Sequence, residues 1–186
     1  MSAASPNALN RSATRGDYAV AMQRPDLSTL DVLVVDPSPH MAALIGQMLR
    51  HLKVRRVEEV HSSDGAAVLL QTHRFGAMIL NDVLGPMNGI ALVKALRAAS
   101  EGLNRDTPVI MMSANPDVTE ITMARDAGVT EFLRKPFAVQ HIQTRLHSIL
   151  AAPREFIEAA AFVGPDRRRK RAIHKGGERR AGNRAS

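Results

Sequence analysis

Five polar residues stand at positions where the chain is expected to leave a strand. They are, in chain order, Asp36, Asn81, Asp82, Ser113 and Lys135. Open α/β sheets place their chemistry at the carboxyl ends of the strands, so we expect these side chains to gather in one site. An acid, an amide, a hydroxyl and an ammonium group in one place can hold a charged group. The function depends on whether Asn81 or Asp82 points into that site.

The segments around these positions alternate between strand and helix patterns. Short apolar or β-branched runs predict buried strands, and apolar residues recurring at three and four positions predict helices. The expected strands are Asp31 to Val35, Val54 to Val60, Ala77 to Leu80, Pro108 to Met112 and Glu131 to Leu133. The expected helices are Pro39 to Leu52, one capped by Ser62 or Ser63, Asn88 to Ala99, one from Asn115-Pro116-Asp117 to Gly128, and Val139 to Leu150. This alternation predicts a parallel sheet with helices on both faces.

Composition indicates one cytoplasmic domain with extensions. The chain has 186 residues, 45% of them hydrophobic, and no cysteine, so disulfides and thiolate chemistry are excluded. Residues 1–29 lack an apolar run, and we expect them to form a disordered leader with no membrane-spanning segment. No glycine-rich phosphate loop follows the first strand, and the seven histidines show no metal-ligand spacing. We therefore expect a binding protein and not an enzyme.

Four motifs give residues 30–150 a close resemblance to a known family. They are Val-Leu-Val-Val-Asp at 32–36, Gly-Pro-Met-Asn-Gly at 85–89, Pro-Val-Ile-Met-Met-Ser-Ala at 108–114 and Phe-Leu-Arg-Lys-Pro-Phe at 132–137. At these spacings the chain resembles the receiver domain of bacterial two-component response regulators. The resemblance implies phosphorelay signalling and a flavodoxin-like (βα)5 doubly wound parallel sheet of strand order 2-1-3-4-5.

The same resemblance implies roles for the polar residues. In the family, an Asp at the end of the third strand accepts a phosphoryl group from a histidine kinase, and two acids after the first strand hold Mg²⁺. Ser113 matches the hydroxyl that bonds the phosphate, Lys135 the ammonium that pairs with it, and Phe132 the aromatic side chain that moves on switching. Asp36 matches the first acid, whereas Pro37 stands at the position of the second. With one of the two acids missing, we expect at most a weak Mg²⁺ site at Asp36.

The position of the phosphoacceptor has two possible alignments. The ungapped alignment places Asn81 there, whereas Pro86, four residues beyond Asp82, favours Asp82 and requires a deletion. Side chains alternate along a strand, so only one of the two can face Lys135. We favour Asn81 and interpret the chain as a degenerate receiver that acts by partner or ligand binding, without phosphate or cofactor. The alternative is a conventional regulator phosphorylated on Asp82 by a histidine kinase with Mg²⁺. Ser113 and Lys135 could also serve only to hydrogen-bond each other or Asn81.

The segment from 151 to 186 is strongly basic. It holds ten Lys and Arg against four acids and so carries most of the net charge of +7. We expect a largely disordered tail, with a short amphipathic helix from Arg154 to Phe162 and a break at Gly164-Pro165-Asp166. It resembles Gly-Pro-Asp-Arg-Arg-Arg tails of alphaproteobacterial receivers and, loosely, arginine-rich segments that bind cyclic di-GMP. An acidic protein partner, a cyclic dinucleotide, nucleic acid and a membrane surface are all candidate ligands for the basic residues Arg167, Arg168, Arg169, Lys170, Arg171, Arg179 and Arg180.

Overall fold

The computed structural model describes residues 25–85, 87–159 and 162–167. Its centre is a five-stranded sheet in the order β2-β1-β3-β4-β5, with every neighbouring pair parallel. The strands are β1 (Asp31–Val35), β2 (Arg56–Val60), β3 (Ala77–Asn81), β4 (Val109–Ser113) and β5 (Glu131–Arg134). The predicted flavodoxin-like fold and its strand order are confirmed.

The three central strands are buried on both faces. Every residue of β3 and β4 is buried, as are Val32 to Val35 of β1, which explains why their sequences show continuous apolar runs instead of alternation. The edge strand β2 is more polar and only half-buried over most of its length. Burial thus follows the position of each strand in the sheet.

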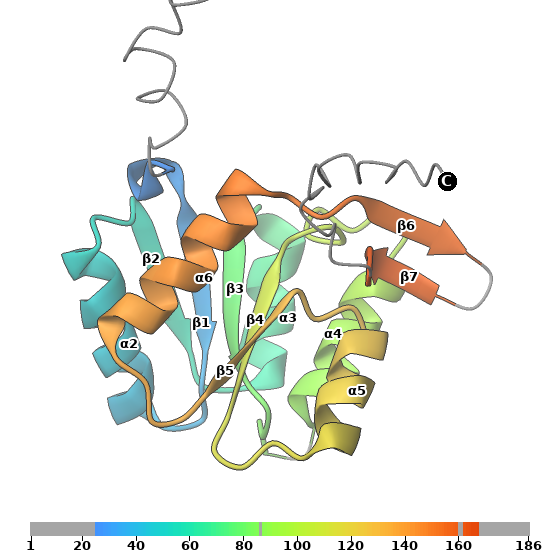
Figure 1. Cartoon of the computed structure of the whole chain (residues 1–186), viewed down its shortest axis with the longest axis horizontal. Coiled ribbons are helices and arrows are strands. Elements are labelled where there is room, and N and C mark those ends of the chain that lie inside the picture. Colours follow the sequence, from blue (N-terminus) through green and yellow to red (C-terminus); the bar gives the residue numbers. More distant parts are fainter. Residues whose placement is uncertain (1–24, 86, 160–161, 168–186) are drawn as a thin grey trace, which may run out of the picture.

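Helices cover both faces of this sheet (Figure 1). The helices α2 (Pro39–His51) and α6 (Val139–Ala151) pack on one face, where Ile45, Leu49, Ile142 and Leu146 join one apolar cluster. The helices α3 (Ser63–Thr72), α4 (Gly89–Ala98) and α5 (Val118–Asp126) contribute to the cluster on the other face. A right-handed crossover from strand to helix to parallel strand gives this two-sided arrangement.

Side-chain caps fix where the helices begin. Ser38, Ser62 and Asn88 each accept a backbone N–H of the first turn of α2, α3 and α4. The helix α5 begins at the end of the expected Asn115-Pro116-Asp117 start, because Asp117 is its cap and accepts the N–H of Glu120 at 2.7 Å, so Pro116 lies before the helix and not in its first turn. Before the sheet, the short 3₁₀ turn η1 (Leu27–Thr29) places Leu27 in the core, so the packed part of the chain includes the last residues of the expected leader.

The segment after α6 forms a β-hairpin, so the predicted helix from Arg154 to Phe162 is wrong. Its strands β6 (Phe156–Ala159) and β7 (Phe162–Pro165) pair antiparallel with each other, with Phe156 opposite Pro165. Nine residues are too few to form a stable helix without packing, and the aromatic and β-branched residues here favour strands. The hairpin lies beside α4 and α5 (Figure 1).

Candidate functional site

The strand ends bring four of the predicted polar residues to one edge of the sheet. Asn81 and Ser113 are the last residues of β3 and β4, Asp36 directly follows β1, and Lys135 directly follows β5. Asp36 and Ser113 are 2% exposed and Asn81 is 9% exposed, so water reaches little of these three side chains.

Lys135 joins the first and third strand ends. Its Nζ donates to Asn81 Oδ1 at 2.8 Å and to Asp36 Oδ2 at 3.2 Å. The Asp36 side chain is 3% exposed and that of Lys135 is 21% exposed, so water screens this ion pair only in part. The backbone N–H of Lys135 also donates to the Ser113 carbonyl at 2.8 Å, which holds the loop after β5 against β4. The ammonium group is therefore held by an acid and an amide of the protein itself.

Asn81 and Asp82 have different partners. Asn81 faces Lys135 with its amide oxygen and donates from Nδ2 to the Val83 carbonyl at 2.7 Å. Asp82 accepts the Val83 N–H through Oδ1 at 2.8 Å, and among the described residues no ion pair or hydrogen bond joins its carboxylate to Lys135. The turn that follows is tight, since a Cβ at Gly89 would lie 2.5 Å from the Asn81 carbonyl oxygen.

The remaining predicted switch residues are Ser113 and Phe132. The Ser113 hydroxyl makes no hydrogen bond within the part of the chain that the structure describes. Phe132 is half-buried, packs against the cluster under α3, α4 and α5, and lines a groove of about 340 Å³ with Ile121 and Val129. His61, which no sequence pattern singled out, places Nδ1 3.2 Å from the Asp36 carbonyl oxygen.

The donor set does not fit a Mg²⁺ ion. Pro37 has no ligand to offer, and Asn81 supplies one neutral oxygen that already accepts from Lys135. The two Asp36 oxygens accept from Lys135 and, at 3.0 Å, from the Ser38 N–H. Mg²⁺ dehydrates reluctantly and is held through carboxylates, of which this site offers one. The described residues contain no cluster of three or more acids, histidines or cysteines placed to bind a metal.

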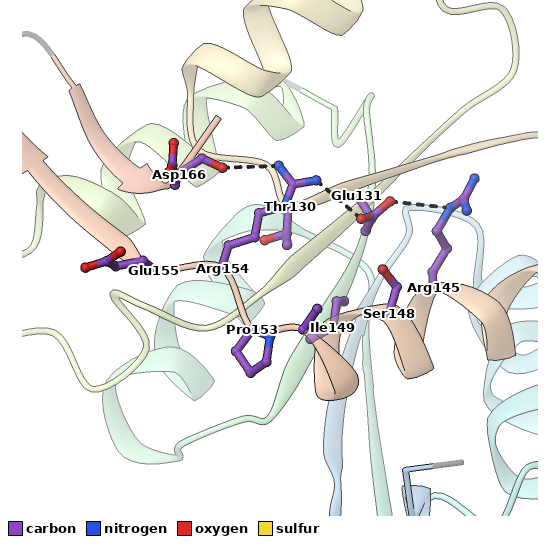
Figure 2. A pocket seen from close by; sticks show the side chains of 10 residues that line it. Thr130, Glu131, Arg145, Ser148, Ile149, Pro153, Arg154, Glu155 and Asp166 are labelled. Carbon is purple, nitrogen blue, oxygen red and sulfur yellow. Dashed lines mark hydrogen bonds and ion pairs between the residues drawn. The ribbon is translucent and has the colours of Figure 1, made fainter. Parts of the chain in front are cut away.

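A larger groove of about 570 Å³ adjoins the groove at Phe132, at the start of β5, and shares Thr130, Glu131 and Arg154 with it (Figure 2). The Glu131 side chain, 10% exposed, stands there between Arg145 and Arg154, at 3.7 and 3.4 Å. Arg154 also donates to the Asp166 carbonyl at 3.3 Å, which ties the base of the hairpin to β5. Sequence reasoning did not identify this group, because its members are distant in the chain and the hairpin was not expected.

Of the seven basic tail residues predicted to bind a ligand, only Arg167 lies in the described part of the chain. Its guanidinium lies 3.1 Å from Asp126 and 3.8 Å above the Phe162 ring. The others, Arg168, Arg169, Lys170, Arg171, Arg179 and Arg180, fall outside the described residues. None of the helices within residues 25–85, 87–159 and 162–167 has the length and apolar run needed to cross a membrane.

Comparison with known proteins places this geometry in a family. The model of the response regulator receiver domain matches residues 32–147. A CheY homolog of Campylobacter jejuni, a chemotaxis protein, is 33% identical over 122 residues, which are 65% of this chain and 92% of the relative. The probable transcriptional regulatory protein TcrX of Mycobacterium tuberculosis is 26% identical over 69% of this chain and 53% of its own length. The chain thus spans about half the length of TcrX.

Solved structures give the same result. The receiver domain of the sensor histidine kinase PA1611 of Pseudomonas aeruginosa, crystallised with a magnesium ion in its active-site cleft, superposes with a TM-score of 0.60. It is 25% identical, and the match covers 66% of this chain and 98% of that one. A putative response regulator of Chloroflexus aurantiacus gives a TM-score of 0.61 at 26% identity, over 66% and 98% of the two chains. With its parallel sheet, its Asp36–Lys135 pair and a family match over more than half its length, this chain belongs to the response regulator receiver domain family of two-component signalling proteins.

Proposed function

We propose that this chain is an atypical receiver that signals by binding a protein partner and does not use an aspartyl phosphate. The observation that carries the proposal is the contact between Lys135 and Asn81, at 2.8 Å. The ammonium that would balance a phosphoryl group is directed at an amide, and an amide does not accept phosphate. Phosphoryl transfer also needs cations to offset the added negative charge, and the donor set here does not fit Mg²⁺.

The position of Asp82 supports this proposal. Its carboxylate faces the backbone N–H of Val83 and not the ammonium of Lys135. To accept a phosphoryl group beside Lys135, it would have to leave the Val83 N–H and displace the Asn81 side chain, which is held by two hydrogen bonds. Each of these steps costs on the order of 1 kcal/mol or more in a part-buried setting.

The partner surface in this proposal includes α5 and Phe132. Val118 is 80% exposed and Ile121 43% exposed on α5, and Ile121 shares the groove beside Phe132. Apolar side chains exposed on one helix next to an aromatic residue are suited to docking of another protein. A basic segment starting at Arg167 would add attraction for an acidic partner, or for a cyclic dinucleotide or nucleic acid through their phosphates.

Intact-mass measurement tests the proposal. The wild-type protein and the Asp82→Ala variant are incubated with acetyl phosphate and Mg²⁺, and their masses are compared with those of untreated samples. We expect no phosphate adduct on either protein. An acid-labile adduct on the wild type that disappears in Asp82→Ala would overturn the proposal and establish a conventional response regulator, served by a histidine kinase and phosphorylated on Asp82.

A further inference from the structure

The hairpin and its flanks, residues 154–159 and 162–167, form a separate element that we term the strap. Its two strands pair only with each other and do not extend the five-stranded sheet. It lies across the ends of α4 and α5 where the strands of the sheet begin, far from the edge that holds Lys135 (Figure 1). The contacts of its side chains therefore decide how firmly it stays in place.

Two arginines of the receiver hold the strap through Phe156 and Glu158. The guanidinium carbons of Arg97 and Arg105 lie 5.9 and 5.5 Å from the centre of the Phe156 ring. Glu158 forms an ion pair with Arg105. Residues two apart on a strand share a face, so Phe156 and Glu158 present an aromatic ring and a carboxylate to the same arginine pair.

The orientation of the Arg97 guanidinium is set by residues outside the strap. Arg97 donates to the carbonyls of Arg105, Thr107 and Gly128. These bonds fix the plane of the guanidinium, while no carboxylate of the described residues hydrogen-bonds to it. A cation held flat and without a carboxylate partner is suited to receive an aromatic face.

The remaining contacts of the strap differ at its two ends. Arg154 reaches Glu131 at 3.4 Å, where the side chains are 19% and 10% exposed, and this pair anchors the start of the strap. Arg167 reaches Asp126 at 3.1 Å, where both side chains are more than a third exposed, and such an exposed ion pair stabilises by at most about 1 kcal/mol, so the strands beyond Arg154 can be released. Gly164 passes so close to α5 that a Cβ on it would lie 3.0 Å from the Gly128 Cα. A side chain at position 164 therefore needs the strap and the Gly128 turn to separate, by a few tenths of an ångström for a methyl group and by more for a branched side chain.

We propose that the Arg97–Arg105 surface is a peptide-binding site that the strap occupies as an internal ligand. Its external ligand is an extended acidic segment of a partner protein, with an aromatic residue two positions before a carboxylate. The chemistry of Phe156 and Glu158 defines this ligand, because the receiver already binds that arrangement. The site lies away from Lys135 and does not depend on whether the chain is phosphorylated, so it goes beyond the function proposed above.

A labelled peptide with the sequence of residues 154–167 tests the site. Fluorescence anisotropy measures its binding to the full-length protein and to full-length Gly164→Val, in which the strap is displaced sterically. Because the strap competes from within the same chain, we expect Gly164→Val to bind the peptide about fivefold to tenfold more tightly than the wild type. Full-length Phe156→Ala, which loses the ring contact instead, should show the same gain.

Charge reversal provides the matched control. A second substitution, Arg105→Glu, in the Gly164→Val protein should abolish binding of the peptide, and a peptide carrying Glu158→Lys should restore part of it. Equal affinity of the peptide for all four proteins would overturn the proposal. Dimerisation of Gly164→Val on size exclusion without peptide binding would also overturn it, since the site would then serve the strap of a second copy.

Discussion

The substitution Asn81→Asp tests the geometry of the Lys135 site most directly. In the wild type, the Asn81 amide uses both ends, with Oδ1 accepting from Lys135 at 2.8 Å and Nδ2 donating to the Val83 carbonyl at 2.7 Å. An aspartate keeps the first bond and loses the second, and it turns a carboxylate oxygen toward the Val83 carbonyl. It also places a second carboxylate beside Asp36 on the same ammonium.

The balance of these effects gives the expected size of the change. The variant loses the bond to the Val83 carbonyl and places two oxygens opposite each other, which together lower the free energy of unfolding by about 1–3 kcal/mol because the site is buried. The charge-assisted bond to Lys135 raises the free energy of unfolding by about 1 kcal/mol, but repulsion between the new carboxylate and Asp36 offsets part of this gain. We therefore expect Asn81→Asp to lower the free energy of unfolding by about 1–2 kcal/mol at pH 7 in the absence of divalent ions.

Magnesium should reverse part of this loss in the variant only. Two carboxylates on one ammonium begin to resemble a Mg²⁺ site, and a site with a dissociation constant of about 1 mM would gain roughly 1.4 kcal/mol at about 10 mM Mg²⁺. Urea unfolding followed by far-UV circular dichroism, with and without Mg²⁺, measures both effects. The wild type should show no response to Mg²⁺, and Asp82→Asn serves as the matched control.

Two results would refute this reasoning. If Asn81→Asp leaves the stability unchanged, the two hydrogen bonds of the amide do not stabilise the fold as the geometry indicates. If the wild type responds to Mg²⁺ and Asp82→Asn removes the response, Asp82 and not Asn81 faces the cation site.

Three further predictions concern the buried charges and the basic segment. Lys135→Met leaves the Asp36 carboxylate, 3% exposed, without its cation and should destabilise the protein by about 2–3 kcal/mol in urea unfolding; an unchanged midpoint would contradict the role of this pair. Burial lowers the pKa of Arg97 to about 10, so between this pH and the higher pKa of an exposed arginine the unfolded chain binds more protons than the folded chain. The stability of the wild type relative to Arg97→Met should therefore rise by about 1 kcal/mol between about pH 8 and pH 10.5, whereas a constant difference would show that Arg97 titrates normally. Alanine substitution of residues 168–171, leaving Arg167 in contact with Asp126, should abolish any electrophoretic retardation of nucleic acid by the protein without changing the melting temperature; retained binding would place such a site on the receiver.

The sequence predicted well wherever local pattern and burial agree. The β1, β3 and β4 segments are apolar runs in the chain and buried strands in the fold. Asn88 and Ser62, the latter one of the two serines considered, cap the helices for which they were predicted. It predicted poorly after Ala151. There the helix expected for Arg154 to Phe162 is a hairpin, because Phe156 finds Arg97 and Arg105 to pack against, and no local pattern reveals partners that distant in the chain.

The sequence by itself determined the alternating strand and helix order, the parallel sheet and the set of polar residues at the strand ends. It narrowed the central position to Asn81 or Asp82, since alternation along a strand allows only one of them to face the site. Only the tertiary structure brought the Lys135 ammonium to Asn81 and Asp36, and only it buried Arg97 beneath the strap. The physical reason is that local periodicity specifies elements, whereas the polar contacts of Lys135 across 54 and 99 residues of chain depend on how those elements pack.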